Sequence, residues 1–346
     1  MTVQAATQAA DVDTAARPTT APAAVSARGL VKRYGSVVAV DGIDLEVHKG
    51  ETFGFLGPNG AGKSTTIGML CTLIQPHEGR ATVAGHDIVR ERDAVRQNIG
   101  LVFQDTTLDG YLTAAQNLRF HAELYGLPRA EVPERTERVL TMVGLWDRRD
   151  SLVGTFSGGM KRRLEIARGL MHTPRVLFLD EPTIGLDPQT RASIWSYLEA
   201  LQRDEETTIF LTTHYMDEAE YCDRIAIIDH GHIIALDTPD ALKASVGRDR
   251  VSIQTADDAA AIAALRARFG LEATIAEGAV TFGVPNGATF VPRLFAELGV
   301  EIRSVSVSRP SLDDVFMSYT GTTIRDAEAS GAEAMRMFAR HMARSH

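Results

Sequence analysis

The sequence has 346 residues, 44% of them hydrophobic, which is long enough for two globular domains. Its formal net charge of −9 argues against a general nucleic-acid-binding protein, because such proteins usually carry a basic surface. No apolar run reaches the roughly 18 residues of a membrane-spanning helix, so a membrane role would require another chain to supply the membrane part.

The N-terminal region is expected to begin without ordered structure. Residues 1–25 are rich in Ala, Thr and Pro and have no apolar periodicity, which predicts a disordered tail. Two strand-like segments follow at residues 37–40 and 43–47, with an Asp-Gly turn signal between them. Tyr34 precedes these segments, and it could either stack on an adenine ring or pack on the sheet as a turn aromatic.

The most informative stretch is FGFLGPNGAGKSTT at residues 53–66. The phosphate-loop pattern G-x-x-x-x-G-K-[ST] is satisfied by Gly57, Gly62, Lys63 and Ser64. An apolar strand precedes the pattern and a helical segment follows it, as the motif requires. Glycines let backbone N–H groups approach a polyphosphate, and a helix N-terminus favours an anion. Lys63 can reach the β- and γ-phosphates, and the Ser64 hydroxyl can ligate Mg²⁺.

The next strand-like run, at residues 99–103, ends in Gln104. Its amide would contact Mg²⁺ or the attacking water if the strand ends beside the phosphate site, and would otherwise be solvated. Residues 113–150 have a helical pattern and separate the two halves of a nucleotide-binding core. One face of the first helix is expected to be apolar and is formed by Leu118, Phe120, His121, Leu124 and Tyr125.

Residues 156–170 predict a second helix N-terminus. Ser157 is a plausible N-cap and is followed by Gly158 and Gly159, so this end could bind an anion or could be only a capped helix. The basic residues of this helix are expected to form a solvated face; they are Lys161, Arg162, Arg163 and Arg168.

Two further strands have polar residues at their carboxyl ends. The apolar run at residues 176–179 precedes Asp180 and Glu181, and the run at residues 207–213 precedes His214. Ligands of parallel α/β sheets bind at the carboxyl ends of strands, so these side chains should lie beside the phosphate loop. There, Asp180 suits a Mg²⁺ site and Glu181 suits a general base that polarises the attacking water. His214 could sense the γ-phosphate or could be structural.

The last part of the chain has a different order of predicted strands and helices. Residues 248–320 have the element order βαββαβ, which is that of a ferredoxin-like domain or a relative of it. A capped terminal helix is predicted at residues 311–316, and residues 322–346 are predicted to form a charged C-terminal tail.

Together these motifs resemble the ATP-binding subunits of ABC transporters. The phosphate loop, Gln104, the Ser-Gly-Gly signature, the paired carboxylates and His214 occur in that family's order. The signature reads FSGGM rather than the common LSGGQ. This variant is similar to drug-export ATPases of the daunorubicin-resistance type, as is the stretch SLDDVFMSYTG at residues 311–321.

The resemblance implies an α/β P-loop NTPase fold. An ABC ATPase domain with a RecA-like core, an antiparallel β subdomain and a helical subdomain is expected at residues 26–246. A small α+β C-terminal domain is expected at residues 247–321. ATP and Mg²⁺ are the implied ligands, and the residues implied to contact nucleotide are Tyr34, Gly57, Pro58, Asn59, Gly60, Ala61, Gly62, Lys63, Ser64, Thr65, Ser157, Gly158 and Gly159.

The same resemblance assigns roles to individual residues. The implied Mg²⁺ contacts are Ser64, Gln104 and Asp180, and the implied catalytic residues are Lys63, Gln104, Glu181 and His214. The signature of a second copy would close over the γ-phosphate, so that two ATP molecules lie between two subunits. The other implied partner is a separate multi-helix membrane permease. It would dock beside the loop after Gln104 and hold this subunit at the cytoplasmic face of the membrane.

Three functions fit this interpretation to different degrees. Export of a small molecule, a drug or an antibiotic, is expected first. Export of a lipid or a polysaccharide remains open, because the permease makes the cargo contacts. A soluble ABC-type ATPase that acts on ribosomes or DNA is the remoter alternative. Such proteins usually have two cassettes or a coiled-coil insertion, whereas this sequence has one phosphate loop and one signature.

Overall fold

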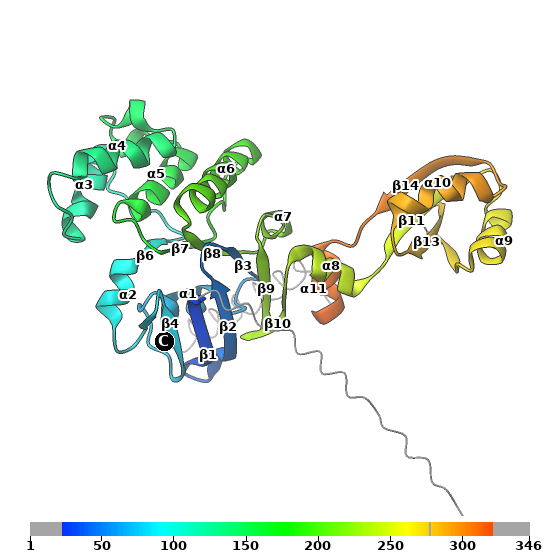
Figure 1. The fold of residues 1–346 in the computed structure, drawn as a ribbon, viewed down its shortest axis with the longest axis horizontal. Helices are drawn as coiled ribbons and strands as arrows, with labels where there is room; N and C mark the ends of the chain where they lie inside the picture. Colours follow the sequence, from blue (N-terminus) through cyan, green and yellow to red (C-terminus); the bar gives the residue numbers. More distant parts are fainter. Residues whose placement is uncertain (1–22, 277, 321–346) are drawn as a thin grey trace, which may run out of the picture.

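The computed structural model describes residues 23–276 and 278–320, which form the arrangement shown in Figure 1. The predicted tail at residues 322–346 lies outside the described residues, as does most of the predicted tail at residues 1–25. The prediction is wrong for residues 23–25, because strand β1 begins at Ala23. Val25 is fully buried and pairs with both neighbouring strands, so this segment belongs to the first sheet.

The first sheet is antiparallel and has the strand order β2-β1-β4-β5. Its strands are β1 (Ala23–Tyr34), β2 (Val37–His48), β4 (Glu78–Val83) and β5 (His86–Asp87). The sequence predicted two strands within residues 37–47, but both halves pair with β1, so β2 is one strand. Gly42 has a φ of 72° and lies where the register shifts, so the Asp-Gly pair forms a bulge rather than a turn.

The second sheet has the strand order β10-β9-β3-β8-β7-β6. Its strands are β3 (Thr52–Leu56), β6 (Ile99–Val102), β7 (Val176–Asp180), β8 (Thr208–Thr213), β9 (Arg224–Asp229) and β10 (His232–Asp237). All neighbours are parallel except β9 and β10. Every residue of β3, β7 and β8 is buried, which explains their continuous apolar runs in the sequence.

Helices lie between or after the strands of the first two sheets along the chain, and Figure 1 labels them. They are α1 (Lys63–Leu70), α2 (Arg92–Asn98), α3 (Ala114–Leu124), α4 (Val132–Met142), α5 (Gly158–Leu170), α6 (Pro188–Glu205), α7 (Met216–Ala219) and α8 (Pro239–Val246). The predicted apolar face of α3 is wrong in part, because Phe120 and Leu124 are 59% and 67% exposed. Leu118 is buried together with Ala114 and Ala122, which are four residues away on either side. These three side chains face the rest of the helical insertion, the region at residues 113–150.

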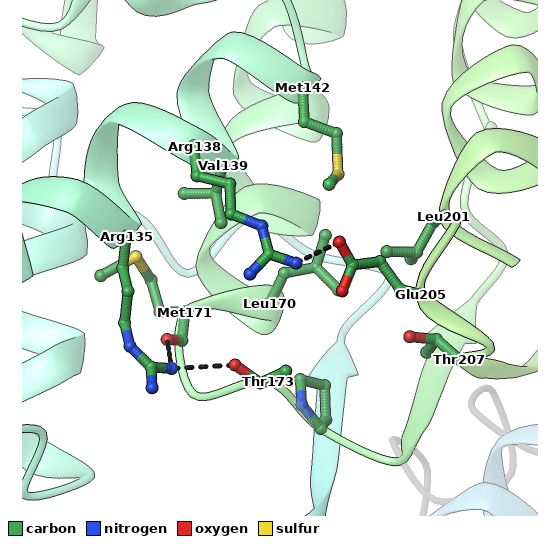
Figure 2. Close-up of a pocket in the computed structure, with 11 residues that line it drawn as sticks. Arg135, Arg138, Val139, Met142, Leu170, Met171, Thr173, Leu201, Glu205 and Thr207 are labelled. Carbon is green, nitrogen blue, oxygen red and sulfur yellow. Dashed lines mark hydrogen bonds and ion pairs between the residues drawn. The ribbon is translucent and has the colours of Figure 1, made fainter. Parts of the chain in front are cut away.

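The helical insertion is attached to the sheet domain through α4 (Figure 2). Arg138 forms an ion pair with Glu205 at the end of α6. Arg135 donates hydrogen bonds to the Met171 carbonyl oxygen at 3.2 Å and to Thr173 Oγ1 at 2.8 Å. The pocket between these side chains has a volume of about 20 Å³, which is room for about one water molecule. It is therefore a packing feature and too small for a nucleotide.

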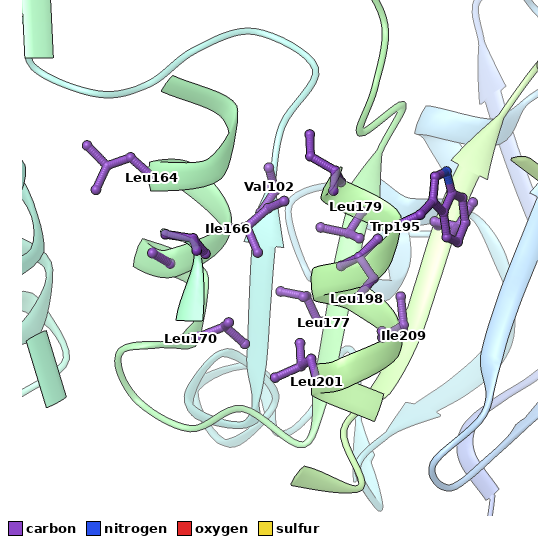
Figure 3. Packing of buried hydrophobic residues seen from close by; sticks show 14 of the residues in the cluster. Val102, Leu164, Ile166, Leu170, Leu177, Leu179, Trp195, Leu198, Leu201 and Ile209 are labelled. Atoms are coloured by element: carbon purple, nitrogen blue, oxygen red, sulfur yellow. The ribbon is translucent and has the colours of Figure 1, made fainter. Parts of the chain in front are cut away.

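A large apolar cluster fixes α5 and α6 against the sheet (Figure 3). The helices contribute buried side chains that meet others from β6, β7 and β8; the cluster includes Val102, Leu164, Ile166, Leu170, Leu177, Leu179, Trp195, Leu198, Leu201 and Ile209. Full burial of one such aliphatic side chain contributes about 1.5–3 kcal/mol. This packing sets the position of α5 relative to the carboxyl ends of the strands.

The C-terminal unit is an antiparallel sheet with two helices. Its elements are β11 (Asp249–Thr255), α9 (Asp258–Phe269), β12 (Ala273–Ala276), β13 (Ala279–Val284), α10 (Gly287–Glu297) and β14 (Ile302–Ser308). The strand order β12-β13-β11-β14 is that of a ferredoxin-like domain. After β14 the chain returns, and α11 (Leu312–Thr320) packs on α8 (Figure 1). Phe316 of α11 is fully buried in the same cluster as Leu242 of α8.

Candidate functional site

The phosphate loop connects β3 to α1 and is enclosed by neighbouring backbone. A Cβ on Gly57 would lie 2.3 Å from the Ile228 carbonyl oxygen, at the end of β9. A Cβ on Gly62, which has a φ of 108°, would lie 2.4 Å from the Ala39 carbonyl oxygen of β2. Both positions therefore require glycine, and the loop follows a path that only glycine allows.

Lys63, the first residue of α1, is folded back over this loop. Its Nζ donates hydrogen bonds to the carbonyl oxygens of Gly57 at 2.7 Å and Pro58 at 3.1 Å. The same atom lies 3.5 Å from Glu181 Oε1, and the lysine side chain is only 4% exposed. The ammonium group thus lies between the phosphate loop and the end of β7.

Three parallel strands end beside this group. β8 pairs with both β3 and β7, so the residues that follow these three strands meet at one edge of the sheet. Ser64 Oγ lies 3.3 Å from Asp180 Oδ1, which also accepts a hydrogen bond from Thr212 Oγ1 at 2.5 Å. Thr212 was not among the predicted site residues, because a buried strand threonine has no distinguishing pattern.

Glu181 and His214 are in direct contact, with 3.2 Å between Glu181 Oε1 and His214 Nδ1. Burial opposes the charged form of Glu181. The hydrogen bond with His214 and the charge of Lys63 outweigh it, so the pKa of Glu181 lies below its ordinary value. The side chain is therefore a carboxylate at neutral pH, the form that a general base requires.

Three other predicted site residues lie away from the carboxylates at the end of β7; they are Tyr34, Gln104 and Ser157. Tyr34 is 49% exposed at the β1–β2 hairpin, where it pairs with Val37. Gln104 is exposed, two residues beyond β6. Ser157 is exposed at the N-terminus of α5 and caps it by accepting from the Met160 N–H at 3.3 Å. Within the described chain, no hydrogen bond or ion pair joins these three side chains to the two carboxylates at the end of β7.

The predicted solvated face of α5 is wrong at Arg162, which is only 6% exposed. Its guanidinium lies under the end of β7 and donates to backbone carbonyl groups there. The sequence contains a pattern that indicates burial of Arg162. Arg162, Glu165, Ile166 and Gly169 have the spacing i, i+3, i+4, i+7, which places an Arg–Glu pair on the same helix face as apolar residues.

Two family models match this chain. Residues 40–184 match the family model for ABC transporters, and residues 238–320 match that for the C-terminal domain of DrrA1-3-like ATP-binding proteins. The daunorubicin/doxorubicin resistance ATP-binding protein DrrA of Streptomyces peucetius is 42% identical, over 89% of this chain and 96% of that protein. The chain belongs to the ABC transporter ATP-binding proteins. This ABC protein is therefore an ATP hydrolase with a DrrA-type C-terminal domain.

Further relatives support the family and the fold. The linearmycin resistance ATP-binding protein LnrL of Bacillus subtilis is 39% identical to this ABC protein, over 87% of this chain and all of that one. The structure of cbiO1 from Clostridium perfringens matches with a TM-score of 0.61 and 29% identity, over 72% of this chain and 96% of that chain. The predicted ABC ATPase fold is confirmed.

One structural relative is a dimer. A dimeric ATP-binding cassette in a post-hydrolysis state, bound to ADP and Pi, matches with a TM-score of 0.57 and 26% identity, over 62% of this chain and 98% of that chain. In residues 23–276 and 278–320 of this ABC protein, the helices are all too short or too polar to cross a bilayer.

Proposed function

We propose that this ATPase powers the export of a small molecule, of the drug or antibiotic class, through a separate membrane permease. The observation that carries the proposal is the extent of the similarity to DrrA, which includes the C-terminal domain at residues 238–320. The names of two relatives refer to resistance to daunorubicin/doxorubicin and to linearmycin. The subunit would be peripheral, at the cytoplasmic face of the membrane.

A groove between the sheet domain and the helical insertion supports a permease partner. It has a volume of about 560 Å³ and lies between α2, β6, α3 and α5. Its lining includes exposed apolar side chains and two arginines; among them are Leu73, Arg96, Phe103, Leu124, Tyr125 and Arg168. Such a surface suits an amphipathic segment of another chain. We assign it to permease docking, which would also explain why Leu124 is exposed.

ATP would bind with its phosphates in the loop from Gly57 to Thr65 and its adenine on Tyr34. The Ser64 and Asp180 oxygens are hard donors that lie 3.3 Å apart at the end of the loop, so they fit Mg²⁺. Gln104 would join them from the loop after β6. An ion held by these residues would supply positive charge beside the bound phosphates.

For hydrolysis, Glu181 would orient and polarise the attacking water, since it is charged and its neighbours hold it in place. His214 and Gln104 would sense the γ-phosphate, and Lys63 would leave the Gly57 and Pro58 carbonyls to contact the phosphates. Lys63, Glu181 and His214 are in contact at one edge of the sheet, and Gln104 would join them from the loop after β6.

The second half of the site would come from a second copy. Ser157 and Gly158 are exposed at the N-terminus of α5, so they are available to another surface. Gly159 is half-buried beside α6, and a Cβ there would lie 2.4 Å from Thr190 Cγ2. We propose that Ser157, Gly158 and Gly159 of one subunit close over the γ-phosphate held by the other, as the dimeric relative supports.

Drug accumulation tests the proposal. A drug-sensitive host would express this subunit with its permease, in the wild-type form or as Glu181→Gln, and the intracellular level of a fluorescent anthracycline would be compared. Lower accumulation with wild type alone is expected. Equal accumulation in both hosts, with ATPase activity present in vitro, would overturn drug export and favour a lipid or polysaccharide cargo.

A further inference from the structure

Arg162 is the most enclosed cation among the described residues of α5, and the proposed mechanism does not use it. We propose that Arg162 is a positioning residue for ATP hydrolysis, which holds the backbone at Glu181 and connects it to the loop after β6. This inference rests on the proposed role of Glu181 as the group that orients water.

The first observation is that one guanidinium binds three consecutive carbonyl groups. Arg162 Nη2 donates to the Asp180 oxygen at 2.9 Å and to the Glu181 oxygen at 3.1 Å, and Nε donates to the Pro182 oxygen at 2.6 Å. These carbonyls belong to the end of β7 and the two residues after it. A planar guanidinium with a fixed set of donors restrains their relative orientation in a way that an ammonium group cannot.

The second observation is that the backbone held in this way is strained. Glu181 has a φ of 46°, in the left-handed region that residues other than glycine rarely adopt. Its N–H donates to Thr212 Oγ1 at 3.0 Å, while its carbonyl oxygen accepts from Arg162. Both sides of the residue are therefore anchored. Such strain persists where the surroundings over-determine the conformation, and it concentrates at functional sites.

The third observation is that the same arginine contacts the loop after β6. Arg162 Nη1 donates to the Phe103 carbonyl oxygen and lies 3.3 Å from Glu165 Oε2. Glu165 is fully buried, and its Oε1 accepts from the Thr107 N–H at 2.7 Å. The Arg162–Glu165 pair thus holds both ends of the segment that contains Gln104.

This arrangement connects two regions of the proposed mechanism. Phe103 and Thr107 line the groove assigned to the permease, whereas Glu181 lies at the phosphate site. A displacement of the loop in the groove would move the Arg162 guanidinium, and with it the Glu181 carboxylate. Because hydrolysis is sensitive to displacements of about 1 Å, this is a route by which permease docking would set the rate of hydrolysis.

The test uses the full-length protein, assayed with and without its permease. Arg162→Lys keeps the charge but loses the planar set of donors. We expect kcat to fall by about 10- to 100-fold, with the KM for ATP changed less than about threefold, since a misplaced catalytic group lowers turnover by about that much. Glu165→Gln is expected to lower the ratio of permease-stimulated to basal ATPase activity.

Arg163→Lys is the matched control, because Arg163 is the next residue of α5 and donates to the Val143 carbonyl oxygen within the helical insertion. Its kcat should stay near that of the wild type. If Arg162→Lys and Arg163→Lys have the same kcat, the proposal is overturned. The same holds if the kcat of Arg162→Lys falls only in proportion to the folded fraction.

A double variant covers the case in which a single substitution leaves an unpaired buried charge and prevents folding. Arg162→Met with Glu165→Met removes both charges, so that no unpaired buried charge remains. The backbone groups that the pair binds lose their partners, so the folded fraction is measured together with kcat. A folded double variant with low kcat supports positioning, and one with wild-type kcat refutes it. Normal turnover in Glu181→Gln would instead refute the role of Glu181, so the two failures are distinguishable.

Discussion

The N-termini of α1 and α5 differ in how much of an anion site the chain itself supplies. Gly62, the residue before α1, has no side chain to cap the helix, and Lys63 lies buried between the loop and Glu181. α5 is capped by its own Ser157, and Ser157 and Gly158 are exposed. The α1 end therefore has its own cation beside the proposed phosphate site within a single chain. The α5 end is a capped helix terminus, and its proposed role requires a second subunit.

The largest expected effect is at the α1 end. Glu181→Gln should keep nucleotide binding and lower kcat by roughly 10²–10⁴, the range for loss of a general base. The structural reason is that the carboxylate is charged and oriented by His214. Steady-state ATPase assays and equilibrium binding of a fluorescent ATP analogue would measure the two quantities. An unchanged kcat would show that Glu181 has no role in hydrolysis. The N-terminus of α1 would then not differ from that of α5 in having a catalytic group of its own chain beside it.

Gly57→Ala tests whether the loop before α1 is preorganised. The new Cβ would lie 2.3 Å from the Ile228 carbonyl oxygen, so the loop must shift, and we expect nucleotide affinity to fall by about 10²-fold. Gly85→Ala is the matched control, because Gly85 lies outside the loop and a Cβ there meets open space. Its left-handed φ of 87° should cost about 1 kcal/mol of stability and leave nucleotide affinity unchanged. Equal losses in both variants would contradict the proposed path of the loop.

Ser157→Asp distinguishes two roles of Ser157, which are capping of α5 and contact with the nucleotide of the other subunit. Aspartate caps helices as well as serine does, so thermal stability should be retained. Its charge would oppose a γ-phosphate bound by the other subunit, and we expect kcat/KM to fall by about fivefold, corresponding to about 1 kcal/mol for two charges 4 Å apart in water. Ser157→Ala, which loses the cap, provides the comparison by lowering stability by about 1 kcal/mol. Wild-type activity of the stable Asp variant would argue that Ser157 only caps α5.

The smallest effect concerns pH. The pKa of Glu181 is lowered in the folded protein, so its carboxylate contributes stability above its ordinary pKa, near 4.3, and loses that contribution as the pH falls through the folded-state value. The difference in unfolding free energy between wild type and Glu181→Gln should be constant from about pH 8 to about pH 5 and change below that. Urea unfolding at several pH values would measure it. A difference that stays the same from about pH 5 down to about pH 3 would indicate that folding does not favour the carboxylate form of Glu181.

Much of the site could be predicted because parallel strands constrain it. Three buried apolar runs are each followed by polar or glycine residues, and the carboxyl ends of neighbouring parallel strands meet at one edge. The contacts of Glu181 with Lys63 and His214 follow from this rule. The roles of Tyr34 and Gln104 stay predictions, because they depend on nucleotide and metal rather than on contacts within the chain.

Other features could not be predicted from local patterns. The continuity of β2 through Gly42 depends on its pairing with β1. The exposure of Phe120 and Leu124 depends on which side of α3 meets the rest of the helical insertion. In each case the local sequence predicted one structure, a turn at Asp-Gly or burial of an apolar residue. The neighbouring strand or helix in the folded protein imposed a different one.

The sequence by itself determined the phosphate loop, the paired carboxylates and the βαββαβ C-terminal unit, because strand periodicity and glycine spacing are properties of the local chain. The ABC ATPase fold was implied by the resemblance that the order of the motifs carries. Only the tertiary structure decided that Arg162 is buried beneath Glu181. An arginine is ordinarily solvated, and it can be buried only where carbonyl groups and a carboxylate from distant segments converge on it. That convergence arises when α5 packs against the ends of β6 and β7.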